Sequence, residues 1–315
     1  MLSFLLRRLL WIVPVLLGIS VAVFGMLKAI PGDPALQILG AYATPERIAA
    51  LTRELGGDLP LPAQYLRWLE AVAHGDLGHS YARERPVLLL LREHLGPTAL
   101  LAAASLGFGS ALGLTLGAVA ARHQGGTLDR VLSTLALVGI STPSFWLAML
   151  LMLALAVWLP VFPVSGLGDG VGPASAREAL HHLVLPAIPL ALVIAGVLAR
   201  TFRATMVEVL RADYLDTARA LGVAEPVVVY RHAFKVALAA VVPVVGLQAG
   251  YALGGAVYIE TVFQWPGLGR LLVEAIGMRD LMLVQGIVLV LASGYVLVNL
   301  AADLVQRWLD PRVLS

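Results

Sequence analysis

Runs of apolar residues without a charged side chain divide the sequence into six segments of membrane-spanning character. They cover residues 9–27, 97–121, 131–159, 183–199, 236–259 and 281–302. A transmembrane helix needs about 20 mostly apolar residues, and one charged residue at its centre costs roughly 2.5–3.5 kcal/mol. The pattern therefore predicts an all-α, polytopic membrane protein with six transmembrane helices.

The composition supports this prediction. Of the 315 residues, 59% are hydrophobic and 13% are charged, whereas a soluble domain has about 25% charged residues. The chain has no cysteine, which excludes disulfides and thiolate metal sites. Residues 9–27 follow a basic start, as in a signal peptide, but no small-x-small cleavage site comes after them, so we expect a retained span.

The spans divide the chain into four regions. Residues 1–29 hold the N-terminal tail and first span, residues 30–96 a small loop subdomain, residues 97–302 a core of five spans, and residues 303–315 a tail. In the subdomain, Pro31–Pro34 and Gly75–Gly78 predict turns, and residues 64–72 have helical period. The subdomain has too little apolar sequence for a core of its own, so we expect it to pack on span ends or on a partner.

The placement of basic residues predicts the orientation. Outside the long first loop, most arginines and lysines fall in residues 7–8, 122–130, 200–235 and 307–312, all on one side of the spans. The opposite loops hold only Arg177, Arg270 and Arg279. By the positive-inside rule both termini are expected in the cytoplasm, and residues 30–96 outside it.

Two spans carry small residues at every fourth position. The first set is Ser105, Gly109, Gly113 and Gly117, and the second is Gly246, Gly250 and Gly254. Such stripes let two helices approach closely in lipid. We expect contacts within the chain, with the alternative that they line a pathway beside a second subunit.

Proline is expected to bend the third span at Ser141-Thr142-Pro143, because it removes a backbone hydrogen bond that serine or threonine hydroxyls can replace. A loop rich in glycine and proline, residues 160–181, follows this span.

Residues 200–235 form a charged segment between the fourth and fifth spans. Asp216–Gly222 reads as a helix that ends at a glycine in the left-handed conformation. Val223–Pro226 reads as a turn and Val227–Lys235 as a second short helix. This pattern fits a docking surface for a soluble partner, and an ordinary amphipathic surface helix is the alternative from the pattern alone.

Three common catalytic and nucleotide-binding motifs do not occur in the sequence. It has no Gly-x-x-x-x-Gly-Lys-Ser/Thr, His-Glu-x-x-His or Gly-x-Ser-x-Gly pattern, so nucleotide binding by this chain is not expected. No span has an ionisable residue at its middle, as an ion-coupled carrier usually would. Energy for transport would then come from a separate motor. The adjacent His181 and His182 point about 100° apart on a helix and would chelate one ion poorly, while His74, His79 and His94 lack ligand spacing.

Several motifs, in order along nearly the whole chain, resemble the permease subunits of binding-protein-dependent ABC importers of the dipeptide/oligopeptide/nickel group. They are Pro31-Gly32-Asp33-Pro34, Gln64-Tyr65, Gly75-Asp76-Leu77-Gly78, Pro163-Val164-Ser165-Gly166, Glu260-Thr261-Val262-Phe263, Trp265–Arg270, Arg279-Asp280, Gln285-Gly286, Val298-Asn299-Leu300 with Asp303, and Asp310-Pro311-Arg312.

The charged segment resembles the EAA loop of that family, the helix pair that docks on the ATPase subunit. The family's Glu-Ala-Ala falls on Asp216-Thr217-Ala218, and its glycine on Gly222. The expected ATPase-coupling residues are Tyr214, Leu215, Asp216, Thr217, Ala218, Arg219, Ala220, Leu221 and Gly222. Two departures stand out: Lys235–Ala240 lacks the usual Asn and Pro, so the bend of the fifth span is expected at Pro243, and Arg279-Asp280 is followed by Leu281-Met282 without the usual proline.

The resemblance implies an inner-membrane subunit of an ATP-driven importer, not itself an enzyme. The implied partners are a second, similar permease, two cytoplasmic ATPase subunits that bind the ATP and magnesium, and an extracytoplasmic solute-binding protein. Nucleic acid is not among them, and no cofactor is expected on this chain. Di- and oligopeptides are the expected cargo; nickel, a metal chelate or glutathione are alternatives in the same group. A passive channel or an intramembrane enzyme is a more remote alternative.

Overall fold

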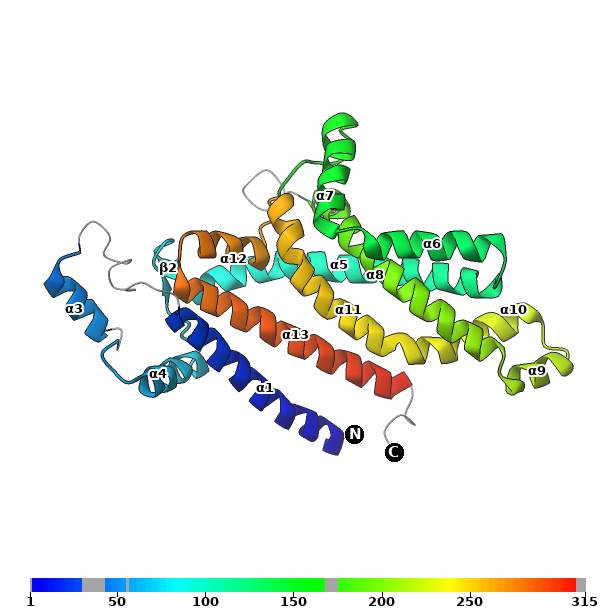
Figure 1. Cartoon of the computed structure of the whole chain (residues 1–315), viewed down its shortest axis with the longest axis horizontal. Helices are drawn as coiled ribbons and strands as arrows, with labels where there is room; N and C mark the ends of the chain where they lie inside the picture. Colours follow the sequence, from blue (N-terminus) through cyan, green and yellow to red (C-terminus); the bar gives the residue numbers. More distant parts are fainter. Residues whose placement is uncertain (1, 30–42, 55–56, 168–174, 310–315) are drawn as a thin grey trace. The chain divides into compact units, whose positions relative to one another are not determined.

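A computed structural model describes residues 2–29, 43–54, 57–167 and 175–309 of the chain (Figure 1). The expected turn at Pro31–Pro34 and the Asp310–Arg312 motif lie outside the described residues. The described part is almost entirely helical, with one two-stranded antiparallel sheet of β1 (His79–Ser80) and β2 (Arg85–Pro86). The chain folds into two compact units, residues 1–94 with 271–294, and residues 95–270 with 295–315. The apolar runs in the sequence predict a different division, in which residues 271–294 belong to the core of residues 97–302.

The described helices occur in the following order along the chain. They are α1 (Leu2–Ala29), α3 (Pro45–Glu54), α4 (Leu61–Ala73), α5 (Val87–Arg122), α6 (Thr127–Ser141), α7 (Ser144–Met152), α8 (Ala176–Leu210), α9 (Asp213–Ala220), α10 (Glu225–Val227), α11 (Phe234–Val262), α12 (Leu268–Gly277) and α13 (Leu281–Leu309), with π-helical turns η2 (Leu153–Trp158) after α7 and η3 (Val228–Ala233) after α10.

Four described helices are long and apolar enough to cross a membrane. They are the helical stretches Val87–Arg122, Ala176–Leu210, Glu225–Val262 and Leu281–Arg307, and the bent pair Thr127–Ser141 with Ser144–Trp158 adds a fifth candidate span. Helix α1 contains a shorter apolar stretch, Leu10–Met26. The chain is therefore a multi-pass helical membrane protein.

In the first unit, the β-hairpin is joined to the start of α13 by Asp280. One Asp280 carboxylate oxygen accepts hydrogen bonds from the Ser80 hydroxyl at 2.5 Å and from the Ala82 N–H at 3.2 Å. The other accepts from the Leu283 N–H at 3.1 Å and so caps α13. An ion pair between Arg83 and Glu274 links the hairpin to α12 as well. The short strands are thus held by polar contacts with residues distant in the sequence.

In the second unit, the glycine stripe of α5 packs against α8. A Cβ atom at Gly109, Gly113 or Gly117 would lie 2.7 Å from a backbone carbonyl oxygen of α8. Those oxygens belong to Ala191, Ala195 and Ala199, which also recur every four residues. Only glycine permits this approach, so the stripe is a helix-packing surface within the chain, as the sequence favoured.

The stripe of α11 packs less completely. A Cβ at Gly246 would collide with Ala302, and one at Gly250 with the Tyr295 ring, both on α13. Gly254 faces open space instead. Close packing therefore involves two of the three expected glycines.

The third span is broken where the sequence predicted a bend. Helices α6 and α7 meet at 97°, around Thr142 and Pro143. The Thr142 hydroxyl donates to the Val138 carbonyl at 2.7 Å, but this oxygen also accepts the Thr142 N–H at 3.0 Å. The hydroxyl therefore does not replace the bond that Pro143 removes, which would go to the Gly139 carbonyl. The bend is large enough that α6 and α7 are separate helices.

Helix α8 is longer at both ends than the expected fourth span, residues 183–199. It begins after Ser175, whose hydroxyl accepts from the Glu178 N–H at 3.2 Å, a capping arrangement that the loop assignment for residues 160–181 overlooked. At the other end the helix continues through Arg200 to Leu210. Charged residues end a membrane span but not a helix, so the connection between α8 and α9 starts only at Arg211.

Candidate functional site

Helix α9 and the turn after it form the core of the candidate site. The helix runs from Asp213 to Ala220, three residues earlier than the sequence predicted at its start. Gly222 follows with φ of +82°, which confirms the predicted left-handed end. The Gly222 N–H donates to the Arg219 carbonyl at 2.9 Å and the Val223 N–H to the Ala218 carbonyl at 3.1 Å. This pair of bonds is a Schellman motif, which closes the helix sharply.

Arg219 stabilises the turn by bonding to residues on both sides of it. Its guanidinium forms an ion pair with Asp216 at 2.7 Å in α9 and two hydrogen bonds of 3.1 Å with the Glu225 carboxylate in α10. These contacts, the Glu225 bond foremost, raise the pKa of Arg219 above its ordinary value. Because both acidic partners flank Gly222, Arg219 fixes the angle between the helices on either side of the turn.

The side chains of α9 divide into an anchoring face and an exposed face. Leu215 is fully buried and packs in a cluster with Phe202, Met206 and Val228. Tyr214 and Leu221 are 49% and 79% exposed. The expectation that Leu215 offers a contact to a partner is therefore wrong, since that side chain holds α9 on the body of the protein.

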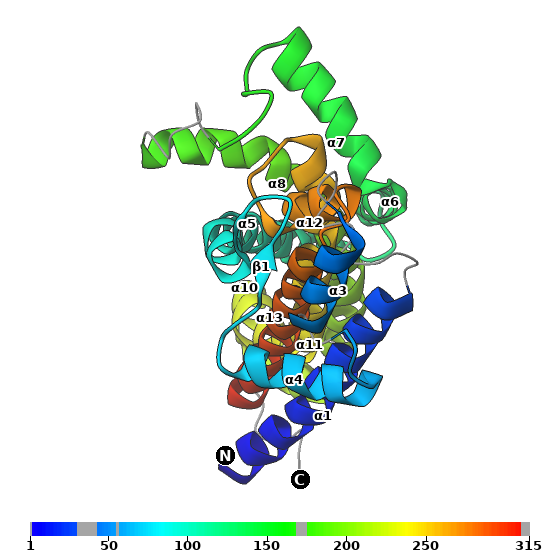
Figure 2. The same cartoon turned by 90° about the vertical axis from the view of Figure 1, so that its left-hand side faces the viewer.

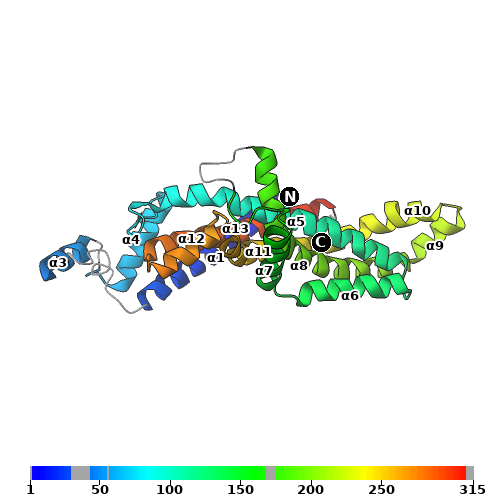
Figure 3. The same cartoon turned by 90° about the horizontal axis from the view of Figure 1, so that it is seen from above.

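The second helix of the pair is the beginning of the next long helix. Residues 225–262 are helical without interruption, through α10, the π-helical turn η3 and α11. The expected separate helix Val227–Lys235 is thus part of that helix. Val228, Val229 and Ala233 are buried, whereas Tyr230 is 54% exposed. Figures 1 and 3 show α9 and α10 together at one end of α8 and α11.

The end of α8 that leads to α9 is tied to α6 by a partly buried ion pair. Arg203 Nε lies 2.5 Å from Asp129 Oδ1, and Arg203 Nη2 donates to Asp129 Oδ2 at 2.6 Å. Asp129 also accepts from the Gly125 N–H at 2.8 Å and from the Ser133 hydroxyl at 3.3 Å. No local pattern in the sequence indicates this pair, because its members lie 74 positions apart.

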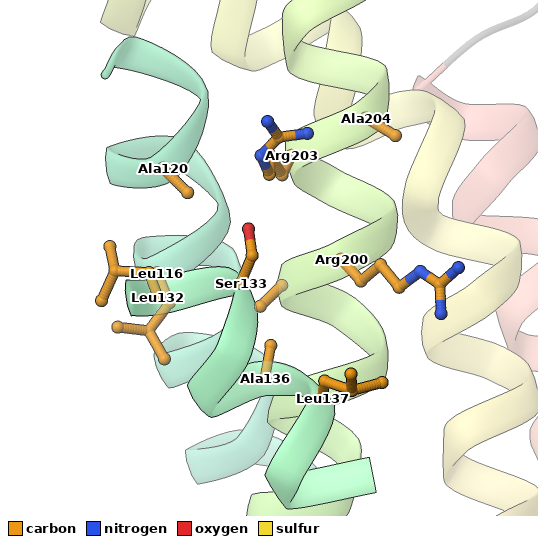
Figure 4. Close-up of a pocket in the computed structure, with 10 residues that line it drawn as sticks. Leu116, Ala120, Leu132, Ser133, Ala136, Leu137, Arg200, Arg203 and Ala204 are labelled. Carbon is orange, nitrogen blue, oxygen red and sulfur yellow. The ribbon is translucent and has the colours of Figure 1, made fainter. Parts of the chain in front are cut away.

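A cavity of about 400 Å³ lies beside this ion pair, among α5, α6 and α8. Its walls are mostly apolar, and Ser133, Arg200 and Arg203 are its polar members. In Figure 4 the Arg203 side chain lies between α6 and α8, whereas Arg200 points away from α6. Because Arg203 is already paired with Asp129, we assign no ligand to this cavity.

A second buried carboxylate, Glu260, organises the segment after α11. In the sequence it directly follows the predicted span 236–259, but it lies in the last turn of α11 and is fully buried. Its oxygens accept from the Thr98 hydroxyl at 2.6 Å and from the N–H groups of Gly269 and Arg270 at 2.6 and 3.1 Å. The carboxylate thus caps the N-terminus of α12, where negative charge is favoured.

The neighbouring motif residues complete this network. The Thr98 hydroxyl oxygen accepts from the Leu268 N–H at 2.7 Å, and the buried Trp265 indole donates to the Pro97 carbonyl at 3.0 Å. A Cβ at Gly267 would overlap the Glu260 carboxylate. The spacing of Glu260 and Trp265–Arg270 in the sequence therefore reflects one compact set of hydrogen bonds.

The adjacent histidines at the start of α8 have separate backbone partners. His181 Nε2 lies 2.9 Å from the Val161 carbonyl, and His182 Nδ1 lies 3.1 Å from the Gly166 carbonyl. Among the described residues no group of three or more histidine, cysteine or acidic side chains is placed to hold a metal ion. The pair therefore reads as a structural link to the preceding loop.

These features define a polytopic membrane protein whose exposed helix pair is anchored between two long helices. The chain belongs to the family of binding-protein-dependent transport system inner membrane components, whose sequence profile matches residues 113–315. The profile of the N-terminal part of such membrane components matches residues 1–102.

Individual relatives match over almost the whole chain. A dipeptide transport system permease protein of Alkalihalophilus pseudofirmus is 38% identical, with 99% of both chains covered. A glutathione transport system permease protein of Pectobacterium atrosepticum and a putative peptide permease of Brucella suis are each 39% identical, again with 99% of both chains covered. A chain of the MetNI methionine ABC transporter, in an inward-facing conformation, has a similar fold at 19% identity, with a TM-score of 0.56 over 70% of this chain and 97% of that chain.

Proposed function

We propose that this chain is a permease subunit of an ATP-driven importer that moves di- and oligopeptides delivered by a solute-binding protein. Relatives named as dipeptide, peptide and glutathione permeases support this class of cargo. Glutathione is itself a small peptide, so it is the alternative cargo that the relatives favour over nickel. In this proposal the chain forms the pathway, and separate ATPase subunits bind ATP and magnesium and hydrolyse the ATP.

The exposed face of α9 is the observation that carries the coupling role. Leu215 holds α9 on the body of the protein while Leu221, at the tip, is 79% exposed. Arg219 and the Schellman turn fix the tip relative to α10. A movement imposed on the tip by a partner would therefore pass into α8 and into the helix at 225–262. ATP-driven closure of the ATPase pair would shift the permease between inward- and outward-open populations.

The proposed assembly has six spans with both termini in the cytoplasm. Helix α1 would supply the sixth span through its apolar stretch Leu10–Met26, and residues 30–96 would lie on the extracytoplasmic side. A second, similar permease and two ATPase subunits complete the complex. The arrangement follows from the arginine and lysine placement in the sequence.

The coupling role is tested by replacing Leu221 with serine in the complete transporter reconstituted in vesicles. Because this side chain is exposed, Leu221→Ser should leave the fold intact but weaken the contact with the ATPase subunit, lowering both peptide uptake and ATPase stimulation. Leu180→Ser is the matched control, since Leu180 is 60% exposed at the opposite end of α8. Full uptake and full stimulation in Leu221→Ser would refute the assignment of α9. Uptake of labelled dipeptide, glutathione and nickel by the unaltered complex separates the cargo alternatives.

A further inference from the structure

Helix α4 packs on the apolar part of α1, within the first unit. The hydroxyl oxygens of Ser20 and Tyr65 lie 2.8 Å apart. The Phe24 ring contacts the rings of Tyr65 and Trp68, with centroid distances of 5.5 and 5.9 Å. Figures 1 and 2 show α4 crossing α1 toward its C-terminal end.

These contacts give the depth of α4 along α1. The apolar stretch of α1 ends at Met26. Phe24 and Ser20 lie two and six residues before that end, which corresponds to about 3 and 9 Å at 1.5 Å per residue. Amphipathic helices that lie in a membrane interface bury their apolar face about 5–10 Å into the boundary of headgroups and acyl chains. Helix α4 is thus attached to α1 at the depth of an interface.

The side chains of α4 form an apolar arc wider than its contact with α1. At 100° per residue, Trp68, Val72 and Tyr65 occupy the half of the arc that faces α1. Leu69 and Leu66 occupy the other half, and Leu66 is 62% exposed.

The opposite side of α4 is polar. It carries Arg67 and Glu70, both exposed. Gln64 also lies on this side, and its amide donates to the Leu59 and Gly57 carbonyls at 2.7 and 3.2 Å, which fixes the entry of the chain into the helix.

We propose that α4 lies in the plane of the membrane interface, in the leaflet at the C-terminal end of α1, with Leu66 among the lipid acyl chains and Arg67 and Glu70 in water. The occupant of the uncovered apolar edge is lipid. A single exposed leucine is ordinary on a protein surface, but this one lies on a helix that also carries Tyr65 and Trp68, whose amphipathic rings favour the interface, and that is fixed to an apolar segment. The inference rests on the proposed function only in taking α1 as a span.

The absence of cysteine from the sequence permits a direct test by site-directed spin labelling. Leu66→Cys and Arg67→Cys place a nitroxide on adjacent residues of α4 that point in different directions, in the complete transporter reconstituted in phosphatidylglycerol and phosphatidylcholine vesicles. Oxygen, which partitions into lipid, should relax the label at position 66 more than a water-soluble nickel chelate does. The preference should reverse at position 67, which serves as the matched control.

Two results at position 66 would overturn the proposal. Easy access of the nickel chelate would place Leu66 in water, and protection from both reagents would mean that a protein partner covers it. A label at Leu17→Cys, in the apolar stretch of α1, tests the span separately. Access of the nickel chelate to position 17 would refute α1 as a span, whereas protection of position 17 with chelate access at 66 would refute only the interfacial placement of α4.

Discussion

Arg203 of α8 and Asp129 of α6 meet through two short contacts of 2.5 and 2.6 Å, with the Asp129 side chain 5% and the Arg203 side chain 29% exposed. Four donors in all converge on this carboxylate. The pair joins the start of α6 to the part of α8 that leads into α9. It therefore makes the base of the proposed coupling helix rigid.

Removing one member of this pair should destabilise the protein. Breaking a fully buried pair costs about 3–5 kcal/mol, and the partial exposure of Arg203 lowers the expected cost of Asp129→Asn to about 2–3 kcal/mol. Thermal unfolding of the purified protein measures the change. The exchanged pair Asp129→Arg with Arg203→Asp should recover part of the loss, and an unchanged melting temperature in Asp129→Asn would contradict the role of the pair.

Gly222→Ala should weaken coupling through backbone strain alone. A Cβ at Gly222 meets nothing within 4 Å, but the residue has φ of +82°, a conformation that costs other residues roughly 1–2 kcal/mol. The turn would relax and the tip of α9 would change direction, so peptide-stimulated ATPase activity should fall while membrane insertion is retained. Gly107→Ala is the control, because Gly107 also faces open space but lies within α5 without a positive φ. Equal stimulation in the two variants would show that the turn geometry does not matter.

Thr98→Val should destabilise the segment after α11. The hydroxyl of Thr98 donates to Glu260 and accepts from the Leu268 N–H, so its loss leaves two buried polar groups with a missing partner, at about 1–3 kcal/mol each. Thr115→Val makes the same chemical change at an exposed site, where the hydroxyl bonds only the Ala111 carbonyl of its own helix. Urea or thermal unfolding should separate the two variants clearly, and coincident transitions would mean that the Glu260 network adds no stability.

The parts of the structure that the sequence predicted well depend on local signals. Gly222 predicted a helix end because glycine readily adopts the left-handed conformation, and Pro143 predicted a bend in the third span. The small residues of α5 predicted a close helix contact because their spacing places them on one face of a helix. Each of these signals is contained within a few consecutive residues or one helical period.

The parts that were missed depend on contacts between distant residues. The burial of Leu215 depends on Phe202 and Val228, so the local pattern alone does not distinguish this residue from a partner contact. The position of Glu260 inside α11 was missed because its partners, Thr98 and Gly269, lie on other helices. The continuation of α8 through Arg203 was missed for the same reason, since Asp129 provides the countercharge.

The contact between α5 and α8 also limits the kind of motion that the protein can use. Three glycines of α5 face three alanine carbonyls of α8 at matching intervals. A slide of one helix along the other by a single residue would drive side chains larger than hydrogen into those carbonyls. The two helices are therefore fixed in register. A force transmitted from α9 can tilt α5 and α8 as a pair, but it cannot translate one helix along the other.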